Sequence, residues 1–253
     1  MKRPLPSLLT AVLVTVCLAS PARACFDTYG FLQKQGLAYP KGLLALETSG
    51  EYVARDLGEP GGDAFSGAAS VYYGLGERFS VQGALASAEK SREECRVDQW
   101  GLRGGCGLVR ADGDGYCLDA VLEVSASTAD GSSAYELSAP NIWYRDHLTV
   151  VFHPVAALAS DGELGMRGHG GVFYSLGGLA IVGLGSEYES AQSSAQFGRR
   201  LVRGAGATSL FVGAGIGPNL FLQNELIKGW GADGADVGFA LTLKYLRPRA
   251  GSH

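Results

Sequence analysis

The sequence ADVGFALTLKYL at residues 235–246 is the clearest structural pattern in the chain. Every second residue from Val237 to Tyr245 is large and apolar, and the residues between them are small or polar. An alternation of period two places one kind of side chain on each face of a β-strand. A strand of roughly ten residues that ends in an aromatic side chain is long enough to cross a lipid bilayer at a tilt, whereas strands of soluble proteins average about five or six.

The chain before this stretch repeats the pattern, separated by turn sequences. We predict twelve strands, at residues 42–54, 64–75, 79–88, 97–109, 116–127, 134–144, 147–159, 163–175, 179–189, 204–217, 219–229 and 235–246. Pro140 and Pro154 fall inside two of them, where the missing N–H donor interrupts a sheet. Splitting or merging strands there would give ten or fourteen instead.

The connections between these strands alternate in length. The short ones are residues 76–78, 110–115, 146, 176–178 and 218. The long ones are residues 55–63, 89–96, 128–133, 190–203 and 230–234, with 160–162 as a short exception. Short turns on one side and long loops on the other are typical of outer-membrane barrels whose termini both face the periplasm.

Residues 1–24 are predicted to be a secretory signal peptide that is cut after Ala24. Removing Lys2, Arg3 and Arg23 from the 21 basic residues leaves 18 against 25 acidic ones, a net charge of −7. This balance argues against nucleic acid as a partner. No later apolar run is long enough for a membrane helix, so a membrane role requires a barrel or peripheral attachment.

Four cysteines follow the signal peptide, and two of them flank a turn. Cys106 and Cys117 are the nearest pair on either side of residues 111–115, and exported proteins commonly form disulfides. Their numbers differ in parity, so in a regular hairpin they would lie on opposite faces unless a bulge intervened. A disulfide between them is one of two open alternatives.

The alternation assigns one polar and one apolar face to the predicted sheet. The polar residues expected to face inward are Glu47, Gln82, Arg103, Asp119, Glu123, Glu136, His153, Arg167, His169, Glu187, Gln223, Glu225 and Lys244. The aromatic residues expected on the outer face, near the two ends of the strands, are Tyr52, Trp100, Tyr135, Tyr188, Trp230, Tyr73, Phe79, Trp143, Tyr174 and Tyr245. Inward charges can select ions in an open pore, or they can pair with one another and close it.

No residue pattern predicts a catalytic or cofactor site. His153 and His169 lie on neighbouring predicted strands, but two scattered histidines are more typical of hydrogen-bonding residues than of metal ligands. No G-x-S-x-G sequence is present, and the turn at residues 112–115 lacks the glycine and glutamate of a calcium loop. We therefore predict no enzyme activity, no cofactor and no metal.

Residues 40–246 resemble Gram-negative outer-membrane β-barrels of the porin-like kind. The resemblance implies an all-β fold, a single antiparallel transmembrane barrel in which strand 235–246 pairs with strand 42–54. It also implies a barrel-insertion machinery and lipopolysaccharide as partners. Residues 25–39 would be a lead segment or plug, and residues 247–253 a tail, although such barrels usually end at the aromatic residue.

Three functions are compatible with this interpretation of the sequence. The first is a small porin-like channel through which solutes pass along the inward polar residues. The second is a closed scaffold barrel that presents loops 89–96 and 190–203 to a partner. The third is a soluble secreted β-sandwich that acts as a binding module.

Overall fold

The computed structural model describes residues 26–54, 63–88, 97–128, 131–160, 162, 164–189, 206–230 and 237–247. The predicted signal peptide, the tail after Arg247, and loops 89–96 and 190–203 lie outside the described residues. Within the described part of the chain, no helix has both the length and the apolar character needed to span a membrane.

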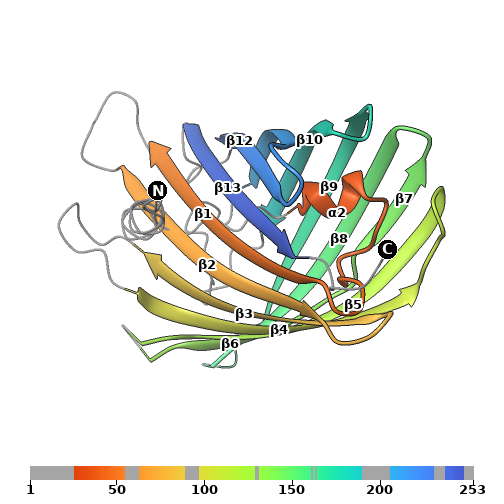
Figure 1. Cartoon of the computed structure of the whole chain (residues 1–253). Coiled ribbons are helices and arrows are strands. Elements are labelled where there is room, and N and C mark those ends of the chain that lie inside the picture. The colour runs from red at the N-terminus through yellow and green to blue at the C-terminus, as the bar shows by residue number, and fades with distance from the viewer. Residues whose placement is uncertain are drawn as a thin grey trace, which may run out of the picture.

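The described chain is one antiparallel sheet that closes into a barrel (Figure 1). Its strands are β1 (Leu44–Ala54), β2 (Ala64–Gly74), β3 (Phe79–Ala88), β4 (Val97–Val109), β5 (Gly115–Ser127), β6 (Ser133–Ser138), β7 (Asn141–Arg145), β8 (Leu148–Ala159), β9 (Leu164–Leu176), β10 (Ala180–Glu189), β11 (Gly206–Gly215), β12 (Leu220–Trp230) and β13 (Val237–Arg247). β13 pairs with β1 from Leu44 opposite Arg247 to Ala54 opposite Val237. The predicted closing pair is confirmed, and the barrel has no free edge.

β6 and β7 together occupy one strand position, which gives a barrel of twelve positions. Both pair with β5 on one side and with β8 on the other. The break between them falls at Pro140, and the amide of Ala139 there donates to the carbonyl of Pro154 at 3.1 Å. The two prolines are therefore adjacent, and the interruption of one strand accommodates the missing donors of both.

The sorting of connections by length also holds, with the predicted exception between β8 and β9, where residues 160–163 form a short connection at the other end. Residues 75–78, 110–114, 146–147, 177–179 and 216–219 join strands at the end of the barrel where β1 begins and β13 ends. We call this the short-turn end. The longer connections all join strands at the opposite end, the long-loop end.

The outer face of the barrel is apolar, as expected of a surface in contact with lipid. The predicted aromatic residues lie on it: Trp100, Tyr135, Tyr188, Trp230, Tyr73, Phe79, Trp143, Tyr174 and Tyr245 are exposed. Tyr52 is half-buried because its ring packs on Phe65, with 4.8 Å between ring centroids. Their role as two interfacial girdles stays a prediction.

The disulfide considered between Cys106 and Cys117 does not form, because both thiols are free. Cys106 lies directly opposite the exposed Phe79 and so shares the outer face. Cys117 is buried inside, with 1% of its surface exposed. A bulge does occur between Gly107 and Val109, but it does not bring the two side chains to the same face.

Residues 26–39, which we call the plug, lie inside the barrel at its short-turn end (Figure 1). The plug contains one short helix, α2 (Thr28–Leu32), whose first turn is capped by the carboxylate of Asp27 accepting from the amide of Gly30. The rings of Phe26 and Phe31 pack on the inward ring of Phe173 at centroid distances of 5.2 and 5.0 Å.

Candidate functional site in the barrel lumen

All thirteen polar residues predicted to face inward lie on the inner side of the barrel. Nine are buried: Gln82, Asp119, Glu123, His153, His169, Glu187, Gln223, Glu225 and Lys244. The other four are half-buried: Glu47, Arg103, Glu136 and Arg167. All except Asp119 and Glu225 line one cavity of about 130 Å³, which the plug bounds through Phe26, Asp27, Leu37 and Tyr39. Their function as pore-lining residues stays a prediction.

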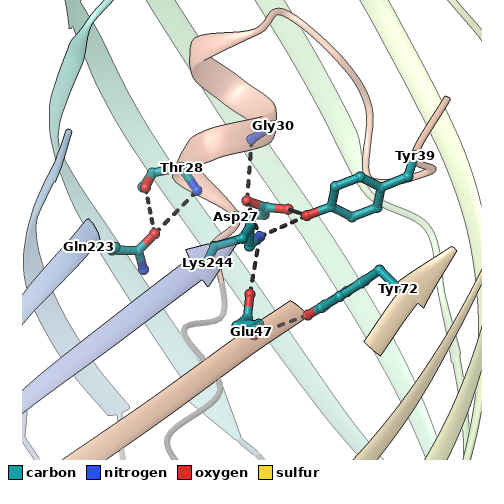
Figure 2. A network of polar contacts seen from close by, with 8 residues as sticks. All are labelled: Asp27, Thr28, Gly30, Tyr39, Glu47, Tyr72, Gln223 and Lys244. Atoms are coloured by element: carbon teal, nitrogen blue, oxygen red, sulfur yellow. Dashed lines mark hydrogen bonds and ion pairs between the residues drawn. The ribbon is translucent and has the colours of Figure 1, made fainter. Parts of the chain in front are cut away.

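The plug is tied to the wall by a network around Lys244, shown in Figure 2. The Lys244 ammonium lies 2.8 Å from a carboxylate oxygen of Asp27 and 3.0 Å from one of Glu47. It also donates to the Tyr39 hydroxyl at 2.7 Å, and that hydroxyl donates to Asp27 at 2.7 Å. Tyr72 completes the set by donating to Glu47 at 3.1 Å. We call these five residues the anchor network.

Lys244 is almost fully buried, so its charge has to be compensated inside the protein. Two carboxylates provide this compensation. The rings of Tyr29, Tyr39 and Tyr72 add to it, because their centroids lie 5.9, 5.5 and 5.3 Å from the ammonium. Groups from both the plug and the barrel strands hold this buried cation. The plug is therefore attached to the barrel by electrostatic as well as apolar contacts.

The plug side of the anchor network has displaced pKa values. Burial alone would raise the pKa of Asp27, but the charge of Lys244 and the hydrogen bonds from Lys244, Tyr39 and Gly30 outweigh it, so the pKa is lowered. Burial and the negative charge of Asp27 hold the pKa of Tyr39 well above its usual value. At neutral pH Asp27 is therefore ionised and Tyr39 keeps its proton, which is the arrangement that the hydrogen bonds require.

Further contacts hold the plug on its other sides. The backbone amide and hydroxyl of Thr28 both donate to the side-chain oxygen of Gln223 (Figure 2). The amide of Leu37 donates to Asp119, which also forms an ion pair with Arg110 at 3.0 Å. These contacts come from strands on different sides of the barrel, so the plug is fixed in one position.

A second group of charges lies on the inner face of the barrel, on the strands β4, β5, β6 and β9. Arg103 binds Glu123 at 2.8 Å, and Arg167 binds Glu136. Glu123 and Glu136 are directly opposite each other on β5 and β6. Like charges in that position repel, and each carboxylate is neutralised by its own arginine.

The two inward histidines lie opposite each other and opposite an acid. His153 on β8 faces His169 on β9, with 5.2 Å between ring centroids, and His169 faces Glu187 on β10. Within the described residues, no three side chains of His, Cys, Asp or Glu are grouped as a metal site.

Sequence reasoning missed the plug's half of the site. Asp27 and Tyr39 lie in a segment without strand periodicity, so no pattern indicated which of its side chains would meet the wall. Tyr72 could have been found, since Val71 and Tyr73 were both predictable as outward residues and the residue between them must point inward.

Comparison with known proteins supports this architecture through structure alone. No family model and no curated protein matches the sequence. Among solved structures, the outer-membrane channel COG4313 from Pseudomonas putida F1 matches with a TM-score of 0.58 and 14% identity, covering 83% of this chain and 96% of that one. The KdgM porin in complex with disordered oligogalacturonate matches with a TM-score of 0.57 and 9% identity, covering 79% of this chain and 98% of that one.

The NanC porin matches similarly, with a TM-score of 0.56, 10% identity, and coverage of 79% of this chain and 98% of that one. This chain has the porin-like fold of outer-membrane β-barrels. The alternative of a soluble β-sandwich is wrong, because the sheet closes on itself through β1 and β13. The three barrels named here are channels rather than enzymes. Their sequence identity to this chain is so low that the comparison shows a shared fold and does not indicate which solute this chain would carry.

Proposed function

We propose that this porin-like barrel is an outer-membrane channel for small polar solutes, and that the plug restricts passage at its short-turn end. One observation carries the proposal. The lumen retains a cavity of about 130 Å³ lined by charged, amide and imidazole side chains, next to a plug whose contacts with the wall are all noncovalent in the described residues. A polar cavity beside a segment that only noncovalent contacts hold is what a gated passage requires.

The charges in this cavity favour cations and neutral solutes over anions. Among its described lining residues, five carboxylates face three cationic side chains: Asp27, Glu47, Glu123, Glu136 and Glu187 against Arg103, Arg167 and Lys244. The KdgM porin was solved with oligogalacturonate, a polyanion. The excess of carboxylates here argues against a polyanionic solute for this chain.

A closed scaffold barrel is the second candidate. It is favoured by the apolar half of the plug, because Phe26 and Phe31 are each 2% exposed within the buried cluster. Burying each ring contributes about 1.5–3 kcal/mol, which makes spontaneous release of the whole plug rare. A channel therefore needs a rearrangement within the plug or an applied stimulus such as voltage.

We propose the outer membrane as its location, with lipid, lipopolysaccharide and the insertion machinery as partners. The exposed apolar outer face supports this location. Purified protein should migrate differently on a detergent gel before and after boiling, as closed barrels do. Identical migration, together with solubility in the absence of detergent, would contradict the location.

Conductance in a planar bilayer distinguishes the two candidate functions. The channel proposal predicts discrete current steps and a reversal potential of the sign for cation preference in a KCl gradient. A heat-modifiable barrel that inserts but carries no current at any voltage would instead establish the scaffold.

A further inference from the structure

Two buried side chains in the cavity have hydrogen-bonding atoms that no described residue satisfies. Gln82 is 3% exposed, and neither its amide nitrogen nor its amide oxygen has a partner in the described part of the protein. His153 is 6% exposed, and its Nε2 atom is equally without a partner there. A buried polar atom that makes no hydrogen bond destabilises the protein, so such atoms commonly mark a place where something else binds.

Both side chains line the same cavity, so one ligand could reach both. Gln82 lies directly opposite Arg103 on the neighbouring strand. The serine hydroxyls of Ser80 and Ser138 line the cavity as well. The cavity thus presents an amide, an imidazole and two hydroxyl groups from three strands, β3, β6 and β8.

The charged groups around these atoms are engaged with one another. Arg103 is bound to Glu123, and Arg167 is bound to Glu136. Lys244 is held by two carboxylates of the anchor network. The hydrogen-bonding capacity that remains at Gln82 and His153 is uncharged, and the amide of Gln82 offers both a donor and an acceptor. A neutral ligand with hydroxyl groups matches it, because each hydroxyl can donate and accept.

The size and the other walls of the cavity fit such a ligand. About ten water molecules would fill 130 Å³ at the roughly 10–15 Å³ that each needs, which is comparable to the heavy atoms of one hexose. The rings of Tyr39, Tyr72 and Phe221 line the cavity too. Aromatic rings beside a few polar groups provide the apolar contact that the C–H groups of a sugar or polyol need.

We propose that Gln82 and His153 form a binding site for a neutral, hydroxyl-rich solute of about monosaccharide size. This inference rests on the proposed function, since it names the class of solute that the lumen would hold during passage. The site retains the solute by hydrogen bonds, and the excess of carboxylates around it discourages anionic competitors.

Equilibrium titration of the detergent-solubilised full-length protein with D-glucose tests the site without requiring conduction. We expect saturable binding in the millimolar range, and at least a ten-fold loss of affinity in Gln82→Leu and in His153→Phe. Gln99→Leu is the matched control, because Gln99 also has a partly unsatisfied amide among the described residues but does not line the cavity. Its affinity should equal that of the wild type. Heat-modifiable migration verifies folding of each variant.

Three outcomes would overturn the inference: no saturable binding of glucose, equal loss in the Gln99→Leu control, or tighter binding of gluconate or protonated glucosamine than of glucose. The experiments distinguish a failure of this site from a failure of the proposed channel function. Conduction without glucose binding would reject the site and keep the channel, whereas glucose binding without conduction would keep the site and reject the channel.

Discussion

Lys244, on the strand that closes the barrel, lies 2.8 Å from Asp27 at the start of the plug, although the two residues are 217 positions apart in the sequence. The same ammonium binds Glu47 on β1. One side chain therefore joins the plug to both strands of the closing pair. Loss of this side chain should weaken both the pairing of β1 with β13 and the attachment of the plug.

The first prediction concerns stability. Lys244→Met keeps most of the apolar stem but leaves the half-buried carboxylates of Asp27 and Glu47 without their cation. Removing one partner of a buried ion pair typically costs about 3–5 kcal/mol. The temperature at which the barrel unfolds on a detergent gel should fall clearly. The control is Lys228→Met, on the exposed outer face of β12, which should lower that temperature much less. Equal unfolding temperatures for both variants would remove Lys244 from the anchor network.

The second prediction concerns acid. The pKa of Asp27 is lowered in the docked plug, so the ionised carboxylate stabilises docking above its ordinary value of 3.8, and this contribution is lost as the pH falls through the lowered pKa. The titratable or charged groups that face it are Lys244, Tyr39, Tyr29, Glu47 and Tyr72.

Current through the wild-type barrel should therefore rise as the pH falls below about 4. Asp27→Asn should show more current than the wild type at neutral pH and a weaker response to acid. An acid response of the same size in Asp27→Asn would assign the effect to another group, such as Glu47.

The third prediction concerns the fit of the plug against the wall. A Cβ atom on Gly185 would lie 2.4 Å from the Phe26 ring and 2.8 Å from the Phe211 ring. Gly185→Ala should therefore push the plug outward, at a cost of about 1–3 kcal/mol for overpacking. Gly168→Ala is the control, because a Cβ atom there meets nothing within 4 Å.

Cys117 reports this displacement, since it is buried in the cluster to which the plug contributes. We expect faster alkylation of Cys117 by a water-soluble maleimide in Gly185→Ala, measured by mass spectrometry of the peptide that contains it. If Gly168→Ala accelerates alkylation as much, the wall and not the plug has been disturbed.

The fourth prediction concerns ion selectivity. Arg103→Gln removes a cation and leaves Glu123 in the lumen, so the preference for cations should increase by at least about two-fold. Glu123→Gln should shift the preference toward anions. Reversal potentials in a KCl gradient measure both changes, with Lys228→Gln as a charge-matched control outside the lumen. If all three variants keep the wild-type ratio of cation to anion permeability, the inward charges do not select ions.

Much of this architecture was predictable because strand alternation is a local property. The parity of Glu123 or Lys244 within its own strand was enough to place it inside, and the alternating connection lengths predicted the two ends of the barrel. The two prolines predicted an irregularity within residues 134–159. They did not predict that the strand would break at Pro140 or that this break would lie beside Pro154. That arrangement depends on the register between two strands.

The anchor network was not predictable for a related reason. Its members on the plug belong to a segment of one short helix and irregular chain, and the partners of Asp27 and Thr28 lie about 200 residues away. No periodicity within residues 26–39 specifies which wall strand they face. Cys106 and Cys117 show the opposite case, where nearness in sequence suggested a bond that their opposite faces prevent.

The current through single barrels of the wild type and of Lys244→Ala, with and without propylammonium, tests the gated channel most directly. Propylammonium replaces the atoms that the substitution removes. A gated channel should show brief openings in the wild type, at least ten-fold more open time in Lys244→Ala, and a return toward the wild-type level when propylammonium is added. Identical currents in the two proteins, or no current from either correctly folded barrel, would contradict it.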